Sequence, residues 1–520
     1  MARSYDLTSG SIPQHLLRLA APLIMGNILQ QLYNTVDAFI LGRFAGELEF
    51  AAVGVAGSVM NLFLFMITGA CTGISVIFAQ LYGAGERERF RREHWLSLSC
   101  GLLVTLACSG LGFLLLSPLL QFIQTPSELK TFVSVYLTII LASLPAEFLY
   151  NLYGALLRAI GRANAALMAF AAAVTVNVAL DYCFVARFQL GIAGAAWATA
   201  ASQAISAVLC ILYLRRKAPE LIFARAYCRM DGELSKQTAH FSFVTALHQS
   251  SLYIGKLLVQ GAVNTGGTDM ISAYTATTRI EGFANSFGDS GSAATSVLVA
   301  QNRGAGKEER VKEPFRSSLF LMLAMSLIMY VSASTSVGFM LGTRSGAAFE
   351  NARDYLKLVA LFYTLCFTGN TFAGYFNGIG KVSVPFLGAT SHIALRVVLS
   401  WLLVGKMGPP PSRWQQASAG CWSTRCGPLS NGGWRKSRKQ QNVILCKHQK
   451  PRALRRAAFD KFCEVSPLIE MRGKEMTFLR KHEVFAHMGK PCRKRKTFVR
   501  DALCLLNFCK VKLFYNSSKW

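Results

Sequence analysis

The chain has 520 residues, of which 52% are hydrophobic and only 16% are charged. This balance excludes a soluble protein with several cores joined by polar linkers, because long apolar runs separated by short charged breaks continue to about residue 405. The net charge of +28 could suggest nucleic acid, but 25 of the 55 Lys and Arg residues lie in residues 408–520. We therefore predict an all-α polytopic membrane protein with no nucleic-acid partner.

Eleven apolar stretches are long enough to cross a bilayer, which takes roughly 20 helical residues. They are residues 15–41, 51–80, 95–122, 131–157, 164–187, 190–214, 240–263, 270–300, 315–342, 355–379 and 383–405. The N-terminus lacks the short apolar core and cleavage site of a signal peptide, so the first stretch is expected to stay as a span. Lys and Arg gather after every second stretch, which places the N-terminus in the cytoplasm by the positive-inside rule.

An internal repeat divides these stretches. The segment AQLYGAGERERFRR from Ala79 returns as AQNRGAGKEERVKE from Ala300. Each copy begins one helix before this segment, and the first copy holds six helices, so the two copies are expected to be parallel six-helix bundles. We predict an N-lobe at 1–217, a cytoplasmic linker at 218–239 and a C-lobe at 240–407. Two such lobes with a cleft between them are the architecture of alternating access.

The second lobe needs a twelfth helix, and residues 408–520 have no apolar run at the equivalent place. A slip of the reading frame near Gly408 explains this, because Trp and Cys codons, which both begin with TG, become Leu, Met or Val codons in the shifted frame. The shifted frame is compatible with an apolar span ending in basic residues. We interpret the tail as out of frame and disordered; the alternative is a genuine soluble basic tail.

Three motifs together are specific: the pattern P…Q..YN..DAF..GR that starts at Pro22, the repeated AQ…GAG segment, and NVALDY from Asn177. The chain resembles the MATE (multidrug and toxic compound extrusion) family of cation-coupled antiporters over residues 5 to about 405. Members have twelve helices in two lobes and exchange protons or sodium ions for organic, often cationic, compounds. The resemblance implies a transporter rather than an enzyme, with H⁺ or Na⁺ as coupling ion and no other cofactor.

Two groups of polar residues lie within the apolar stretches. Gln30, Tyr33 and Asp37 are spaced to share one face of the first helix. Asn177 and Asp181 are one helical turn apart in the fifth stretch and project together. A carboxylate within a membrane needs a wet cavity or hydrogen-bonding partners, and two carboxylates facing each other favour binding of a proton or a sodium ion. The alternative is a water-facing position at the outer interface.

The resemblance assigns roles to these positions. It implies that Asp37, Asp181 and Asn177 form the N-lobe cation-coupling site, where Na⁺ is the metal ion expected if the coupling ion is not a proton. Gln30 and Tyr33 would line the same chamber, and we add Asn151 as a further substrate-binding candidate. Pro22 removes a backbone hydrogen bond and permits a kink, which in the family accompanies protonation, or is a static packing kink here.

Other charges fall in the seventh and eighth stretches. Lys256 with Glu281 or Asp289 is expected to form an intramembrane ion pair, with substrate contact or an interfacial position as alternatives. The Gly-Ala-Gly segments follow helices and lack the Lys and Ser or Thr of a phosphate-binding loop, so they are expected to form tight turns. The sequence offers no nucleophile paired with a base.

We therefore expect a monomeric antiporter of the bacterial inner membrane that exports small organic cations, surrounded by lipid. One alternative is a lipid-linked saccharide flippase of similar architecture, although that function would need cationic residues along the cleft. Another is a non-functional product that lacks the twelfth helix. Sequencing the gene across the Gly408 codon separates the last alternative from the others.

Overall fold

The computed structural model describes residues 7–407, except residues 124, 224, 229–230, 265–267, 342–344 and 346. The predictions about residues 408–520, including the reading-frame slip and the replaced twelfth helix, lie outside the described residues. Within them the chain is all-α, and the predicted polytopic membrane architecture is confirmed. We call the helices up to Lys217 the N-lobe and those from Gly232 onward the C-lobe.

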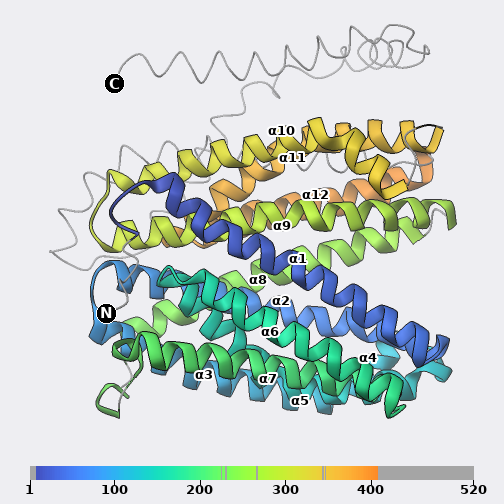
Figure 1. The fold of residues 1–520 in the computed structure, drawn as a ribbon, viewed down its shortest axis with the longest axis horizontal. Coiled ribbons are helices and arrows are strands. Elements are labelled where there is room, and N and C mark those ends of the chain that lie inside the picture. Colours follow the sequence, from blue (N-terminus) through green and yellow to red (C-terminus); the bar gives the residue numbers. More distant parts are fainter. Residues whose placement is uncertain are drawn as a thin grey trace, which may run out of the picture. The chain divides into compact units, whose positions relative to one another are not determined.

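All eleven predicted stretches coincide with long helices (Figure 1). The N-lobe contains α1 (Ile12–Phe44), α2 (Glu47–Gly83), α3 (Arg87–Leu114), α4 (Leu116–Phe122), α5 (Ser127–Ala159), α6 (Ala163–Asp181), the π-helical η1 (Tyr182–Arg187) and α7 (Gly191–Lys217). The short helices η2 (Pro219–Leu221) and η3 (Arg225–Tyr227) lead to the C-lobe, which contains α8 (Gly232–Asn264), α9 (Thr268–Gly304), η4 (Arg310–Lys312), α10 (Glu313–Leu341), α11 (Ala347–Gly378) and α12 (Ser383–Met407).

Two boundaries differ from the predictions for local reasons. The predicted stretch 95–122 is divided between α3 and α4, since Pro118 in the first turn of α4 has no amide hydrogen to continue the bonding of α3. Helix α8 begins at Gly232, inside the predicted linker 218–239. There the carboxylate of Asp231 accepts hydrogen bonds from the backbone N–H groups of Glu233 and Leu234 and caps the helix.

Six of the described helical segments combine the length and apolar composition of a membrane span: Glu47–Gly83, Arg87–Leu114, Ser127–Ala159, Ala163–Arg187, Gly191–Lys217 and Arg310–Thr335. Helix α1 is not among these six, and it carries Arg18, Gln30 and Asp37 along its length. Its polar residues are the first sign that α1 contributes to a functional site rather than only to the lipid-facing surface.

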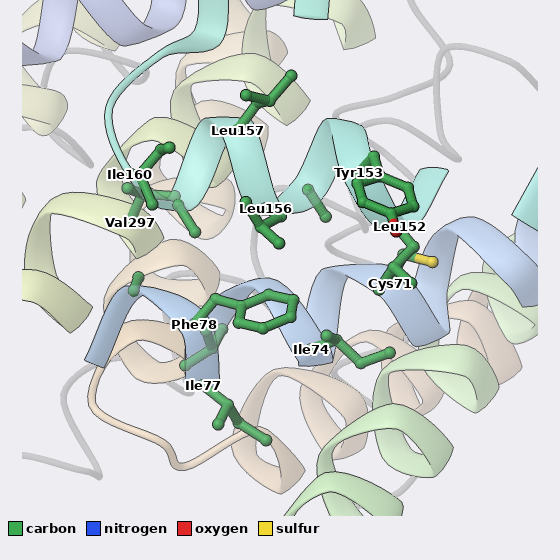
Figure 2. Packing of buried hydrophobic residues seen from close by; sticks show 14 of the residues in the cluster. Cys71, Ile74, Ile77, Phe78, Leu152, Tyr153, Leu156, Leu157, Ile160 and Val297 are labelled. Carbon is green, nitrogen blue, oxygen red and sulfur yellow. The ribbon is translucent and has the colours of Figure 1, made fainter. Parts of the chain in front are cut away.

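The largest hydrophobic core forms where α2 packs against α5. Figure 2 shows Cys71, Ile74 and Phe78 of α2 facing Leu152 and Leu156 of α5. Helix α2 also packs against α8 and α9, so the N-lobe and C-lobe meet along this helix. Small residues permit the close approach, because a Cβ atom at Gly69 or Gly73 would collide with backbone atoms of α8.

The repeated Gly-Ala-Gly segments form the predicted tight turns at equivalent places in the two lobes. Gly85 has φ +72° and Gly306 has φ +71°, a conformation that favours glycine. A second pair of glycines, Gly161 after α5 and Gly380 after α11, has φ +78° and +74°. These matching turns extend the repeat from sequence to backbone geometry.

The repeated segments also bind the lobes to each other. A Cβ atom at Gly83 would collide with the carbonyl oxygen of Gln301, and one at Gly304 would collide with the carbonyl oxygen of Gln80. Gln80 Nε2 donates to the carbonyl oxygen of Gly378 at 3.0 Å, and Gln301 Nε2 donates to that of Ala159 at 2.5 Å. Each glutamine therefore binds the last residue of a long helix in the opposite lobe: Gln80 binds the end of α11, and Gln301 binds the end of α5. We call this contact the AQ crossing.

Candidate cation site

Asp37 of α1 and Asp181 of α6 lie beside each other. Helix α1 packs against α6, and the two carboxyl groups interact electrostatically and lie within hydrogen-bonding reach. Asp181 is fully buried, whereas Asp37 is half-buried. Two carboxylates at this separation repel each other unless a proton or a metal cation lies between them.

Three of the four carboxylate oxygens have no hydrogen-bond donor among the described residues to stabilise their charge. Asp37 Oδ1 and both carboxylate oxygens of Asp181 are buried without a donor. Asn177, one turn before Asp181 on α6, is 1% exposed, and its amide oxygen and nitrogen also have no partner in this part of the chain. Buried polar atoms without partners cost free energy, so this group of oxygens suits a cation or protons as ligand.

Two further residues contribute polar groups that the sequence analysis did not identify. Tyr33 Oη and Thr199 Oγ1 of α7 are hydrogen-bonded at 3.0 Å. Tyr136 of α5 is buried and interacts electrostatically with both aspartates. Helical periodicity shows which face of its own helix a residue occupies, and it does not show that α5 and α7 face the same point as α1 and α6.

The backbone changes its winding immediately after Asp181. Helix α6 ends at this residue, and Tyr182–Arg187 continue as a π-helix, which is rare and frequent at functional sites. The segment closes with Gln189 at φ 54°, an uncommon conformation for a residue with a side chain. Asp181 thus lies at a junction between two helical windings, next to a carboxylate of another helix.

A small cavity of about 10 Å³, room for roughly one water molecule, adjoins this group between α1, α6 and α7. Its lining includes Tyr33, Phe170, Asn177, Ser202, Gln203 and Ser206. Ser202 donates to the carbonyl oxygen of Thr199, whereas the hydroxyl of Ser206 is buried without a partner among the described residues. The cavity therefore combines two aromatic rings with several polar groups and reaches Asn177 of the candidate site.

The remaining predicted N-lobe residues occupy different surroundings. Gln30 donates to Asn34 on the same helix at 3.3 Å, in an exposed position. The side chain of Asn151 forms hydrogen bonds with Glu147 and Thr68, and none of these bonds reaches Asp37 or Asp181. The structure thus brings Tyr33, Asn177 and the two aspartates together, whereas the hydrogen bonds of Asn151 go to Glu147 and Thr68. The role of Asn151 in binding substrate stays a prediction.

Pro22 is buried inside α1, which continues as one helix from Ile12 to Phe44. Because proline has no amide hydrogen, the carbonyl group one turn earlier lacks its usual helical donor at this point. Helix α1 contacts α6 in the N-lobe and α9 in the C-lobe. A change in its curvature would therefore act on the aspartate pair and on the contact between the lobes.

The predicted C-lobe charges are only partly described. Lys256 of α8 and Asp289 of α9 both have exposed side chains, and Lys256 attracts the carboxylate of Asp289 electrostatically. No direct ion pair joins these two described side chains. The side chain of Glu281 lies outside the described side chains, so the pairing of Lys256 with Glu281 stays a prediction.

Comparisons with known proteins agree with this geometry. The family model described as MatE matches residues 22–183 and 243–402. The chain is similar to the probable multidrug resistance protein YpnP of Bacillus subtilis, with 25% identity over 408 residues that cover 77% of this chain and 88% of YpnP. It is also similar to multidrug and toxin extrusion protein 1 of Danio rerio, with 23% identity over 409 residues that cover 75% of this chain and 68% of that protein.

Solved structures show the same fold. A structure described as MATE in the bent conformation superimposes with a TM-score of 0.77 at 18% identity, covering 85% of this chain and 100% of that chain. One described as MATE in the straight conformation gives a TM-score of 0.74 at 20% identity, with the same shares covered. At these identities the likeness concerns the arrangement of the helices.

Proposed function

The chain belongs to the MATE family of multidrug efflux transporters, and from this premise we propose that it exports organic cations in exchange for protons or sodium ions bound at Asp37 and Asp181. The observation that carries the proposal is the facing pair of carboxylates, three of whose four oxygens are buried with no donor among the described residues. A site of this kind binds a proton or Na⁺ when the cation is available and becomes repulsive when it leaves.

The coupling acts through α1. Cation binding neutralises the charge of the aspartate pair and removes the repulsion between α1 and α6, so the curvature of α1 at Pro22 changes. Because α1 also touches α9, the change reaches the contact between the lobes. Solved relatives described in bent and straight conformations support a bending step of this kind.

We infer the substrate class from the relatives and from the lining of the small cavity, which would have to widen to admit a drug. Tyr33 and Phe170 offer aromatic faces to a cation, and Gln203 offers an amide oxygen. Negative charge is supplied by the aspartates near Asn177. Gln30, near the middle of α1 and on the same face as Tyr33, would contact substrate on its way in or out. These features favour a small amphiphilic cation over an anionic lipid-linked saccharide.

We place the protein in the cell inner membrane as a monomer, with its N-terminus in the cytoplasm. Four arginines lie in the segment from Arg87 to Arg92 at the start of α3, and Arg215, Arg216 and Lys217 end α7. Positive charge at these helix ends is typical of cytoplasmic loops. The AQ crossing then lies at the cytoplasmic end, where it would hold the lobes closed while the site opens outward.

The experiment that tests the proposal compares ethidium efflux by the unaltered protein and by Asp37→Asn in cells, with membrane levels matched. We expect efflux by the variant to fall to the background of cells without the transporter, because the neutral amide takes up no coupling ion. Glu128→Gln, a charge removal at an exposed position in the first turn of α5, is the matched control and should transport normally. Full transport by Asp37→Asn would overturn the assignment.

The coupling ion is identified in the same cells. A protonophore collapses the proton gradient, and a sodium ionophore collapses the sodium gradient. The treatment that stops efflux by the unaltered protein names the ion that occupies the aspartate pair. Efflux that survives both treatments together would contradict ion coupling while leaving the family membership intact.

Residues 408–520 bear on how much activity this chain retains. We propose that they are read out of frame after about residue 407, and the match to the family model ends at residue 402. Efflux by this chain is therefore compared with efflux by a version whose reading frame is restored at Gly408. Transport by the restored version alone would mean that loss of the twelfth helix inactivates the protein, whereas equal transport would show that this helix is dispensable.

A further inference from the structure

A third buried carboxylate of the N-lobe stands apart from the aspartate pair. Glu147 lies within α5 and is 7% exposed. Its carboxylate oxygen Oε1 accepts a hydrogen bond from Asn151 Nδ2 at 2.6 Å, and the Asn151 amide oxygen accepts one from Thr68 of α2 at 3.3 Å. Asn151, predicted to contact substrate, thus orients the carboxylate of Glu147.

Glu147 has no cationic partner among the described side chains. The ion pairs in this part of the chain are Arg89 with Glu86 and Arg92 with Glu88, both near the end of α3 that follows the first Gly-Ala-Gly turn. The titratable groups that interact with Glu147 are Cys71 of α2 and Tyr150 of α5. A carboxylate within the membrane that meets only amide, thiol and phenol groups has a high cost in its charged form, which proton uptake removes.

A chain of contacts connects Glu147 to the cavity beside the aspartates. Tyr150, which interacts electrostatically with Glu147, stacks on Phe170 of α6 with ring centroids 5.8 Å apart. Phe170 lines the same cavity as Asn177 and Ser206. On its other side Tyr150 interacts with Arg158, which lies in the last turn of α5 beside the Gly161 turn.

Asp181 and Glu147 lie at different distances from the helix ends that meet at the Gly161 turn. Asp181 ends α6 and lies roughly 27 Å along that helix from its start at Ala163, at a rise of 1.5 Å per residue. Glu147 lies roughly 18 Å along α5 from its end at Ala159. The end of α5 and the start of α6 flank the Gly161 turn. Along the helix axes, Glu147 is therefore closer to this turn than Asp181 is.

We propose that Glu147 relays protons between the Asp37–Asp181 pair and the aqueous phase at the Arg158 end of α5. This inference rests on the proposed function, with the proton as coupling ion. In the forward step the carboxyl group of Asp181 loses its proton and the carboxylate of Glu147 gains it, so one acid and one carboxylate exchange states. The hydroxyls of Ser202 and Ser206 line the cavity that Phe170 and Asn177 also line. Glu147 then gives the proton to water and returns to its charged form.

Glu147→Gln tests the relay because glutamine keeps the shape and can still bond with Asn151, but carries no exchangeable acid proton. The matched control is Glu93→Gln. Glu93 of α3 is also fully buried, but its two oxygens accept hydrogen bonds from Ser97 and Thr238, away from the cavity. Both variants are purified, checked for folding by thermal unfolding, and reconstituted in vesicles at equal density.

Two transport modes are measured in the vesicles. Exchange of labelled for unlabelled ethidium requires no net proton movement, whereas uptake driven by a proton gradient does. We expect Glu147→Gln to retain exchange and to lose most proton-driven transport, with a changed pH profile, and Glu93→Gln to retain both. Equal loss of the two modes in Glu147→Gln would assign Glu147 a structural role, and unchanged proton-driven transport would also overturn the relay.

Infrared spectroscopy gives an outcome that does not depend on transport. The difference spectrum between the unaltered protein and Glu147→Gln contains the carbonyl band of the Glu147 acid. The relay requires this band to appear and disappear over the pH range in which efflux operates, and a band that stays constant overturns it. If sodium drives efflux, the relay is wrong while antiport stands. If the unaltered protein transports nothing, the proposed function fails, and the infrared titration still decides whether Glu147 exchanges a proton.

Discussion

The two lobes repeat each other at their turns and differ at the candidate cation site. Counting forward equally from Gly161 and Gly380, Asn177 of α6 corresponds to Arg396 of α12, and Asp181 corresponds to Ser400. In the N-lobe these positions carry an amide and an acid. In the C-lobe the equivalent positions carry the guanidinium group of Arg396 and the hydroxyl of Ser400. Ser400 Oγ donates to the carbonyl oxygen of Arg396 at 2.7 Å.

This difference separates residues that serve the fold from residues that serve ion binding. Glycines with matching φ and the two glutamines of the AQ crossing occur in both lobes, because both lobes must turn and meet in the same way. Asp181, by contrast, has no acidic counterpart at the equivalent C-lobe position, Ser400. A cation that enters the C-lobe at the equivalent place would meet the positive charge of Arg396, so one lobe carries the proposed coupling site.

The largest effect is expected when the two lobes are made alike at this position. Asp181→Ser gives the N-lobe the residue of the C-lobe and removes one of the two facing carboxylates. We expect ion-coupled ethidium efflux to fall to background. Without Asp181, the carboxylate of Asp37 faces no second carboxylate, and the repulsion that drives cation binding and release is lost. The measurement is efflux in cells at matched membrane levels.

Ser400→Asp is the reverse exchange and the matched control. The new carboxylate lies one turn after Arg396, which would neutralise it, so efflux should change little. A transporter that works with Asp181→Ser, or one that fails with Ser400→Asp at normal expression and stability, would contradict the assignment of coupling to the N-lobe.

The second prediction concerns what the lobes share. Gly83→Ala and Gly304→Ala each place a Cβ atom against a backbone carbonyl of the opposite lobe. Backbone atoms cannot rotate away, so we expect each variant to lose about 1–3 kcal/mol of stability, measured as a lower unfolding temperature in detergent. Because the two positions are equivalent, the two losses should be similar.

Gly57→Ala is the control for this pair. Gly57 lies on α2, and a Cβ atom there would meet no atom within 4 Å. Alanine has the higher helix propensity, so stability should stay equal or rise slightly. A loss as large as that of Gly83→Ala would show that α2 tolerates no alanine in general and would remove the argument from close packing.

Particular residues show which features of the fold and the site can be predicted from the sequence. The apolar stretches and the repeat predict the helices and their turns, because length, hydropathy and glycine spacing are local properties. Helical spacing places Tyr33 and Asp37 on one face, and the structure sets them beside Asp181. The contribution of Thr199, the π-helix at Tyr182–Arg187 and the partnership of Asn151 with Glu147 depend on which helices meet at what height. Periodicity within one helix carries no information on that point.

The smallest effect is expected from the side chains of the AQ crossing. Gln80→Met and Gln301→Met keep the length of the side chain and remove the donor to Gly378 and to Ala159. Each lost hydrogen bond should cost about 0.5–1.5 kcal/mol in thermal unfolding. Substitution of Gln301, which is 1% exposed, should cost more stability than substitution of the part-buried Gln80, since water cannot replace the bond of Gln301.

The double variant shows whether the two bonds are coupled. If the two bonds act independently, the double variant shows the sum of the losses. A double variant no less stable than Gln301→Met alone would mean that the bonds form and break as a unit, so that opening one side of the crossing already releases the other.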